Sequence, residues 1–135
     1  MSGRDFPKRK LSHDNYKTDD WILAMLGRNY YDPCPLNENP TIDGLDLDWN
    51  QEAFCYNNIF INPPYSSPKA WVIKAIETSR APENSVAVIL LLKHDSSTEW
   101  YRLLHEAGAR FLLINGRLKH QTGKSAAFPS VLCIL

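Results

Sequence analysis

The residues with the clearest chemical character are Asn62, Pro63, Pro64 and Tyr65, which directly follow an apolar run. Each proline lacks a backbone N–H and holds the residue before it out of the helical region, so the carbonyl groups of this turn take fixed directions. The Asn62 side chain adds an amide oxygen as a second acceptor. The Tyr65 ring offers a face for a flat base, and such stacking is worth about 1–3 kcal/mol. The turn therefore predicts a clamp for a planar –NH2 group.

Such a clamp suits methylation of an amino nitrogen that is conjugated to a ring or a carbonyl group. The lone pair of this nitrogen is delocalised, and two acceptors that hold its hydrogens draw it toward a tetrahedral shape. A methyl sulfonium donor must then be held in line with the nitrogen. This chemistry requires no covalent enzyme intermediate. A Pro-Pro turn with a packed tyrosine is the alternative, and the position between an apolar strand and a capped helix favours the clamp.

The elements that must position this turn alternate between strands and helices, which predicts an α/β sheet with right-handed crossovers. We expect helices at 19–27, 67–80 and 96–108, the second capped by Ser67 and the third by Ser96 or Ser97. We expect about five strands, at 29–32, 57–61, 85–92, 109–115 and 128–135. The run at 85–92 is apolar from Val86 onward, which is typical of a central parallel strand covered on both faces. Asn62 then lies at the carboxyl end of a strand, where α/β sheets bind ligands.

The chain of 135 residues has no net charge, but its charges are unevenly distributed. Residues 29–68 contain no Lys or Arg and six acidic side chains: Asp32, Glu38, Asp43, Asp46, Asp48 and Glu52. This stretch is either a solvated acidic loop or a place for a cationic ligand. The three cysteines form no zinc pattern and fit a reducing compartment. No signal peptide and no membrane span is expected, which favours a cytoplasmic protein.

Several stretches occur in the order seen in a known family: YKTDDWILAML, YYDPCP, DGLDLDW, FINPPYSSPKAWVIKA, LLLKHDSSTEWY, NGRLKH and AAFPSVLCIL. From about residue 14 to 135 the chain resembles the phage-type (Dam-like) DNA N6-adenine methyltransferases, which depend on S-adenosylmethionine. The resemblance implies a reduced Rossmann-like class I methyltransferase sheet, mostly parallel with flanking helices. It also implies methyl transfer to adenine N6 in double-stranded DNA, with the target base flipped out. Residues 1–14 are expected to be a flexible basic arm before one methyltransferase domain at 15–135.

The resemblance also implies roles for individual residues. The catalytic motif corresponds to Asn62, Pro63, Pro64 and Tyr65. The expected cofactor residues are Tyr16, Thr18, Asp32, Pro33, Cys34, Asp43 and Asp46, with Tyr16 and Thr18 near the methionine end of the cofactor. Asp43 is placed near either the cofactor or the target base. The expected nucleic-acid residues are Lys69, Lys93, His94, Asp95, Arg117, Lys119 and Lys124. No metal is expected.

The chain departs from the family pattern in ways that leave alternatives open. Asp19 and Lys93 stand where many relatives have Pro, and the segment between Asp32 and Asn62 is short. Full-size methyltransferases place two strands there, one ending in the acid that binds the ribose, so here Asp46 or Asp48 must serve or the acid is missing. Asp95 and His94 either line the pocket or belong to a helix cap. The same chemistry on RNA adenine or a glutamine amide, a catalytically weak binding module, and a homodimer on DNA remain possible.

Overall fold

The computed structural model describes residues 18–35, 43–116, 118 and 128–135. In these ranges the helical elements are α1 (Asp20–Leu26), η1 (Gly44–Asp46), α2 (Trp49–Glu52), α3 (Lys69–Arg80) and α4 (Glu99–Glu106). The strands are β1 (Tyr30–Tyr31), β2 (Asn58–Ile61), β3 (Ala87–Lys93), β4 (Arg110–Leu113) and β5 (Ser130–Ile134). The predicted α/β alternation is thus confirmed. The basic arm expected at 1–14 lies outside the described residues.

The five strands form one mixed sheet in the order β1-β2-β3-β5-β4. The β1–β2 and β2–β3 pairs are parallel, whereas β5 pairs antiparallel with both β3 and β4. The predicted mostly parallel sheet is therefore only partly correct. An apolar strand buried on both faces shows the same sequence pattern in either direction, so the pattern could not reveal that β5 runs against its neighbours.

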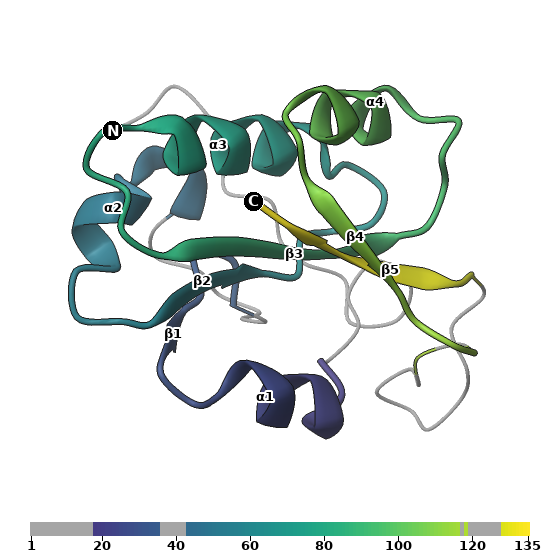
Figure 1. The fold of residues 1–135 in the computed structure, drawn as a ribbon, viewed down its shortest axis with the longest axis horizontal. Helices are drawn as coiled ribbons and strands as arrows, with labels where there is room; N and C mark the ends of the chain where they lie inside the picture. Colours follow the sequence, from purple (N-terminus) through teal and green to yellow (C-terminus); the bar gives the residue numbers. More distant parts are fainter. Residues whose placement is uncertain (1–17, 36–42, 117, 119–127) are drawn as a thin grey trace.

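Helices cover both faces of the sheet, with α3 and α4 on one side and α1 on the other (Figure 1). Alternate strand residues fall into two apolar clusters, as the period of two requires. Ile59 and Ile61 join the cluster under α3 and α4, whereas Phe60 between them joins Ile22 of α1. Strand β3 is buried along Val88–Leu92. The prediction of a central strand covered on both faces is thus confirmed.

One side-chain and one backbone hydrogen bond extend the ties between the end of α1 and the start of β2 beyond apolar packing. Asn58 Nδ2 donates to the Leu26 carbonyl at 3.2 Å, at the end of α1. The Asn57 amide donates to the Asn29 carbonyl at 2.9 Å. Since α1 ends beside the start of β2, the helix runs back along the strand, and its beginning lies near the strand's carboxyl end.

The segment between β1 and β2 contains η1 and α2 and, among its described residues, no strand. Helix α2 is held to α3 by stacking of Trp49 on Trp71, with ring centroids 6.1 Å apart. Asn50 Nδ2 adds a hydrogen bond to the Thr78 carbonyl at 3.0 Å. Side chains rather than strand pairing therefore attach this segment. No helix in the described part of the chain is long and apolar enough to cross a membrane.

Candidate active site at the carboxyl edge of the sheet

The parallel strands β1, β2 and β3 end at the same edge of the sheet, which we call the carboxyl edge. Asp32, Asn62 and His94 directly follow these three strand ends. Strand β5 begins at this edge because Lys93 pairs with Ser130 and the His94 amide donates to the Pro129 carbonyl at 2.9 Å. The topology thus brings most of the predicted site residues to one edge, as expected for an α/β sheet.

Asn62 is 6% exposed, and its side chain is hydrogen-bonded to Thr18, which precedes α1. Asn62 Nδ2 donates to Thr18 Oγ1 at 3.0 Å. This hydrogen bond joins a residue predicted for catalysis to one predicted for cofactor binding. It uses a donor of the amide and none of the acceptor capacity of the amide oxygen.

The Pro-Pro segment forms a tight, largely buried turn. Pro63 and Pro64 are buried, and the Ser67 amide donates to the Pro64 carbonyl at 3.3 Å. Pro68 already has helical backbone angles, and no side-chain cap hydrogen bond is present at the start of α3, so the predicted Ser67 cap is wrong. The turn directs Tyr65 toward the start of β5.

Tyr65 forms an aromatic corner with Phe128, a residue that the sequence places only at the beginning of the last expected strand. The ring centroids are 4.9 Å apart with an interplanar angle of 72°. Such edge-to-face pairs are favourable. The two residues are far apart in sequence, and only the placement of β5 beside β3 brings them together. Nothing in the sequence pattern near Phe128 indicates this contact.

The predicted cofactor residues Asp32 to Cys34 and Asp43 form two turns that pack on each other. Asp32 Oδ1 accepts from the Cys34 amide at 2.8 Å, and Asp43 Oδ1 accepts from the Leu45 amide at 3.0 Å. A Cβ atom on Gly44 would lie 1.7 Å from the Pro33 carbonyl oxygen, so only glycine fits between the turns. We call these two turns, 32–34 and 43–45, the acidic turns.

The acidic side chains in and beside these turns differ in exposure, and a hydrogen bond from α2 holds one of the turns. Trp49 Nε1 donates to the Gly44 carbonyl at 2.8 Å. Asp43 is buried at 6% exposure, Asp32 is half-buried, and Asp46 is exposed in η1. Asp48 caps α2 by accepting from the amides of Asn50 and Gln51. Of the two acids proposed for a ribose contact, Asp48 is thus engaged in a structural cap.

The tyrosines of β1 respond to burial and to the acids around them. Burial, together with the charges of Glu52 and Asp32, raises the pKa of Tyr31 to about 12. Burial and the Asp32 charge also raise the pKa of Tyr30. Both phenols are therefore neutral at physiological pH, and they sit in a region of negative potential.

The end of β3 places a lysine beside the aromatic corner. Lys93 Nζ lies 5.8 Å from the centroid of the Phe128 ring and 4.0 Å from an Asp95 carboxylate oxygen. Asp95 accepts hydrogen bonds from the Ser97 hydroxyl and amide, which lower its pKa, and the Lys93 charge adds to this. The predicted cap at Ser96 or Ser97 is wrong, because Thr98 caps α4 by accepting from the Tyr101 amide.

The remaining predicted nucleic-acid residues are only partly described. Lys69 is exposed at the start of α3, with its Nζ 2.8 Å from Glu99 Oε2 of α4. Tyr16, Arg117, Lys119 and Lys124 lie outside the described residues. Within the described ranges, no group of three or more His, Cys, Asp or Glu side chains could hold a metal ion.

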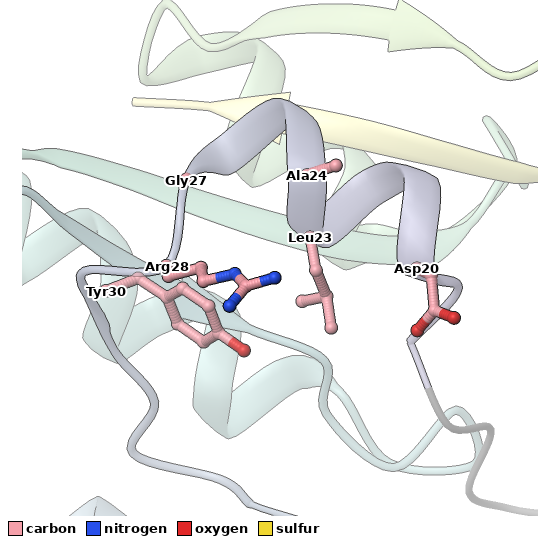
Figure 2. A pocket seen from close by; sticks show the side chains of 6 residues that line it. All are labelled: Asp20, Leu23, Ala24, Gly27, Arg28 and Tyr30. Carbon is pink, nitrogen blue, oxygen red and sulfur yellow. The ribbon is translucent and has the colours of Figure 1, made fainter.

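A cleft of about 510 Å³ that the sequence did not predict lies between α1 and β1. Its lining residues are Asp20, Leu23, Ala24, Gly27, Arg28 and Tyr30. Arg28 and Tyr30 lie together at one end, Asp20 lies at the other, and Leu23 projects between them (Figure 2). It flanks the beginning of α1, the helix that follows Thr18.

Comparisons with known proteins place the chain in one family. Residues 8–127 match the family model described as DNA N-6-adenine-methyltransferase (Dam). A DNA N-6-adenine-methyltransferase of Haemophilus phage HP1 is 25% identical over 87% of the chain and 76% of that relative. One of Escherichia phage T1 is 28% identical over 78% of the chain, which spans only 46% of that relative. No solved structure matches the chain. The chain therefore belongs to the DNA N-6-adenine-methyltransferase (Dam) family.

Proposed function

We propose that the chain transfers a methyl group from S-adenosylmethionine to the N6 amino group of adenine in DNA. The observation that carries this proposal is the meeting of the Asn62 amide, the Tyr65–Phe128 corner and the acidic turns at one edge of the sheet. Membership of the Dam family supports it, as do the names of the two phage relatives. The activity and substrate of those proteins are extended here to this chain.

The clamp acts on a base that has left the duplex, because an adenine inside the stack is out of reach. One N6 hydrogen is donated to Asn62 Oδ1 and the other to a backbone carbonyl of the Pro-Pro turn. The Tyr65 ring stacks on the base. Phe128 packs edge to face with Tyr65 and so fixes the orientation of the Tyr65 ring. These contacts aim the nitrogen lone pair at the methyl group and are strongest as the nitrogen becomes tetrahedral.

The acidic turns fit a cationic methyl donor. Asp43 and Asp32 lie on turns in direct contact, and residues 29–68 contain no Lys or Arg. S-adenosylmethionine, when bound, supplies an electrophilic methyl group on a positively charged sulfur. Asp46 is favoured for the ribose hydroxyls because it is exposed, whereas Asp48 is engaged in capping α2. Tyr16, Pro33 and Cys34 complete the proposed donor site, and Thr18 borders it through its hydrogen bond with Asn62.

DNA phosphates are proposed to contact Lys69 and Lys93, together with Arg117, Lys119 and Lys124. Lys69 can exchange Glu99 for a phosphate at little cost, because exposed ion pairs contribute about 0–1 kcal/mol. His94 and Asp95, at the end of β3, are the two candidates for accepting the proton that the methylated nitrogen releases. The lowered pKa of Asp95 makes it a weak base. His94 is therefore favoured, and Asp95 organises the loop before α4.

The test incubates the protein with labelled S-adenosylmethionine and, in parallel, with duplex DNA, RNA and protein substrates. Label on adenine N6 of duplex DNA is expected, and Asn62→Ala should abolish it. Asn29→Ala is the matched control, since Asn29 is exposed at the other end of β1 and should keep full activity. Full activity in Asn62→Ala would overturn the mechanism. Transfer to RNA or a glutamine amide, but not to DNA, would show that the substrate is RNA or protein. DNA binding without donor binding would show that the chain is a nucleic-acid-binding module and not a methyltransferase.

The oligomeric state on DNA is tested separately. A domain of this size is expected to cover little DNA by itself, and a homodimer would enlarge the contact. Sedimentation of the protein with a short duplex should show two copies per duplex, and one copy per duplex would remove the dimer from the proposal.

A further inference from the structure

The hydrogen bond between Thr18 and Asn62 points to a role for Thr18 that differs from holding the cofactor. Thr18 Oγ1 accepts from Asn62 Nδ2 at 3.0 Å, and both residues are at least half-buried. A side-chain amide carries a donor and an acceptor of similar size at its two ends. Turning the amide over would exchange them. The clamp works only when the oxygen faces the amino group of the base, because an N–H there would oppose the N6 hydrogens.

We propose that Thr18 is the positioning residue that fixes the Asn62 amide with its oxygen toward the target amino group. The inference rests on the proposed function of Asn62 as the clamp. The hydrogen bond from Nδ2 to the Thr18 hydroxyl holds the amide in this orientation before any base arrives, since a turned amide would require the hydroxyl to donate instead of accept. This preorganisation lowers the barrier of the transfer step and leaves binding of the DNA phosphates unchanged.

The surroundings of Thr18 hold it in place for this role. The Asp19 carbonyl accepts from the amides of Ile22 and Leu23, so α1 begins directly after Thr18. Ile22 is fully buried in the same cluster as Phe60, two residues before Asn62. At the other end of α1, Leu26 is tied to Asn58 of β2. Helix and strand are thus fixed to each other at both ends, and the Thr18–Asn62 bond spans two anchored elements.

The positioning role is compatible with a contact to the cofactor and separable from it. A threonine hydroxyl can accept from Asn62 and still donate its own proton to another group. Loss of a cofactor contact would weaken donor binding. Loss of the positioning contact would slow turnover without changing donor affinity. A cofactor contact therefore predicts a change in the dissociation constant of the donor, whereas the positioning role predicts a change in kcat.

The first test compares Thr18→Val with Thr18→Ser, which keeps the hydroxyl. We expect Thr18→Val to lower kcat about tenfold, as loss of one hydrogen bond predicts. The dissociation constant of S-adenosylmethionine and the KM for DNA should stay within about twofold, and Thr18→Ser should restore kcat. Thr78→Val, at a buried threonine of α3 outside the carboxyl edge, is the control for general effects of hydroxyl loss. Weaker donor binding with unchanged kcat would overturn the proposal.

The second test repeats Thr18→Val in an Asn62→Asp background. Both oxygens of a carboxylate are acceptors, so this side chain has no wrong orientation to exclude. The tenfold loss in kcat should therefore shrink to less than about twofold, a non-additivity expected of coupled groups. An equal fold-loss in both backgrounds would contradict the positioning role.

A third measurement is independent of catalysis. The side-chain amide protons of Asn62, assigned by their disappearance in Asn62→Asp, should shift in the NMR spectrum of Thr18→Val and return in Thr18→Ser. This result shows whether the Thr18–Asn62 hydrogen bond forms, independently of whether the wild-type protein transfers a methyl group or Asn62→Asp is active. An unchanged Asn62 resonance in Thr18→Val would show that the hydrogen bond does not form, and the inference would fail.

Discussion

The two halves of the sheet are built in different ways. The half that we propose binds the target base, called the base half, is β2-α3-β3 with β5. It contains the Pro-Pro turn and consists of paired strands that are buried almost throughout. The half that we propose binds the methyl donor, called the donor half, consists of β1, the acidic turns and α2. It has a strand of two residues. Hydrogen bonds that the Asp32, Asp43 and Asp48 side chains accept, and one that Trp49 Nε1 donates, hold its loops.

Because of this difference, we expect substitutions in the two halves to have different effects on activity and stability. In the base half, packing secures the backbone, so a substitution in the turn alters chemistry more than stability. In the donor half, a few local contacts fix the conformation of the loops. A single substitution that disrupts one of these contacts should therefore lower both stability and donor binding. The following predictions test this contrast.

The largest effect is expected at the clamp. Asn62→Ala should lower kcat by about a thousandfold, because it removes an acceptor that acts on charge developing in the transition state. The free energy of unfolding should fall far less, since β2 and α3 keep their packing. Single-turnover methylation and urea unfolding measure the two quantities. A loss of stability that accounts for the loss of activity would contradict the contrast.

Gly44→Ala should be the most destabilising change in the donor half. The new Cβ would overlap the Pro33 carbonyl oxygen, and the free energy of unfolding should fall by about 3 kcal/mol. Weaker binding of S-adenosylmethionine should accompany it, measured by calorimetry. Gly27→Ala is the matched control, because Gly27 has a φ of +83° but nothing within 4 Å of a Cβ. That control should cost about 1 kcal/mol from backbone strain and leave donor binding intact. Equal costs at both glycines would show that the turns do not depend on close packing.

Tyr65→Ala should weaken the grip on the flipped base by about 2 kcal/mol, or roughly thirtyfold in KM for DNA. Tyr65→Phe keeps the ring and its edge contact with Phe128, so it should be nearly neutral. Steady-state kinetics on one duplex compares them. If Tyr65→Phe were as damaging as Tyr65→Ala, the hydroxyl rather than the ring face would carry the function.

The smallest effect concerns the pH dependence of the base half. Burial raises the pKa of the Cys133 thiol from 9.0 to about 12, so the unfolded chain loses this proton first as the pH rises. The contribution is fully present below about pH 9 and declines above it. Between pH 8 and pH 10 the free energy of unfolding should fall by about 1.4 kcal/mol. Urea unfolding at both pH values measures this, and Cys133→Ala should lose correspondingly less over the same interval. An identical decline in both proteins would remove Cys133 as the cause.

Much of the candidate site could be predicted from sequence because it lies in continuous stretches. Asn62 to Tyr65 were proposed from residue type and from the strand before them, and the helices and strands follow apolar spacing. The cap at Thr98 was missed because three hydroxyl residues in a row offer equivalent sequence choices. Phe128 was missed as a partner of Tyr65 because its contact depends on which strand lies beside β3.

The sequence by itself determined the alternation of elements, the rigid Asn-Pro-Pro-Tyr turn and the acidic stretch, since local backbone restriction and residue chemistry do not need a partner. The tertiary structure alone decided the antiparallel place of β5, the Tyr65–Phe128 corner, the fit of Gly44 against Pro33 and the Thr18–Asn62 bond. Each of these contacts joins residues that are distant in the chain or on separate turns. Their geometry depends on how strands pair and helices pack, which residue type and spacing do not specify.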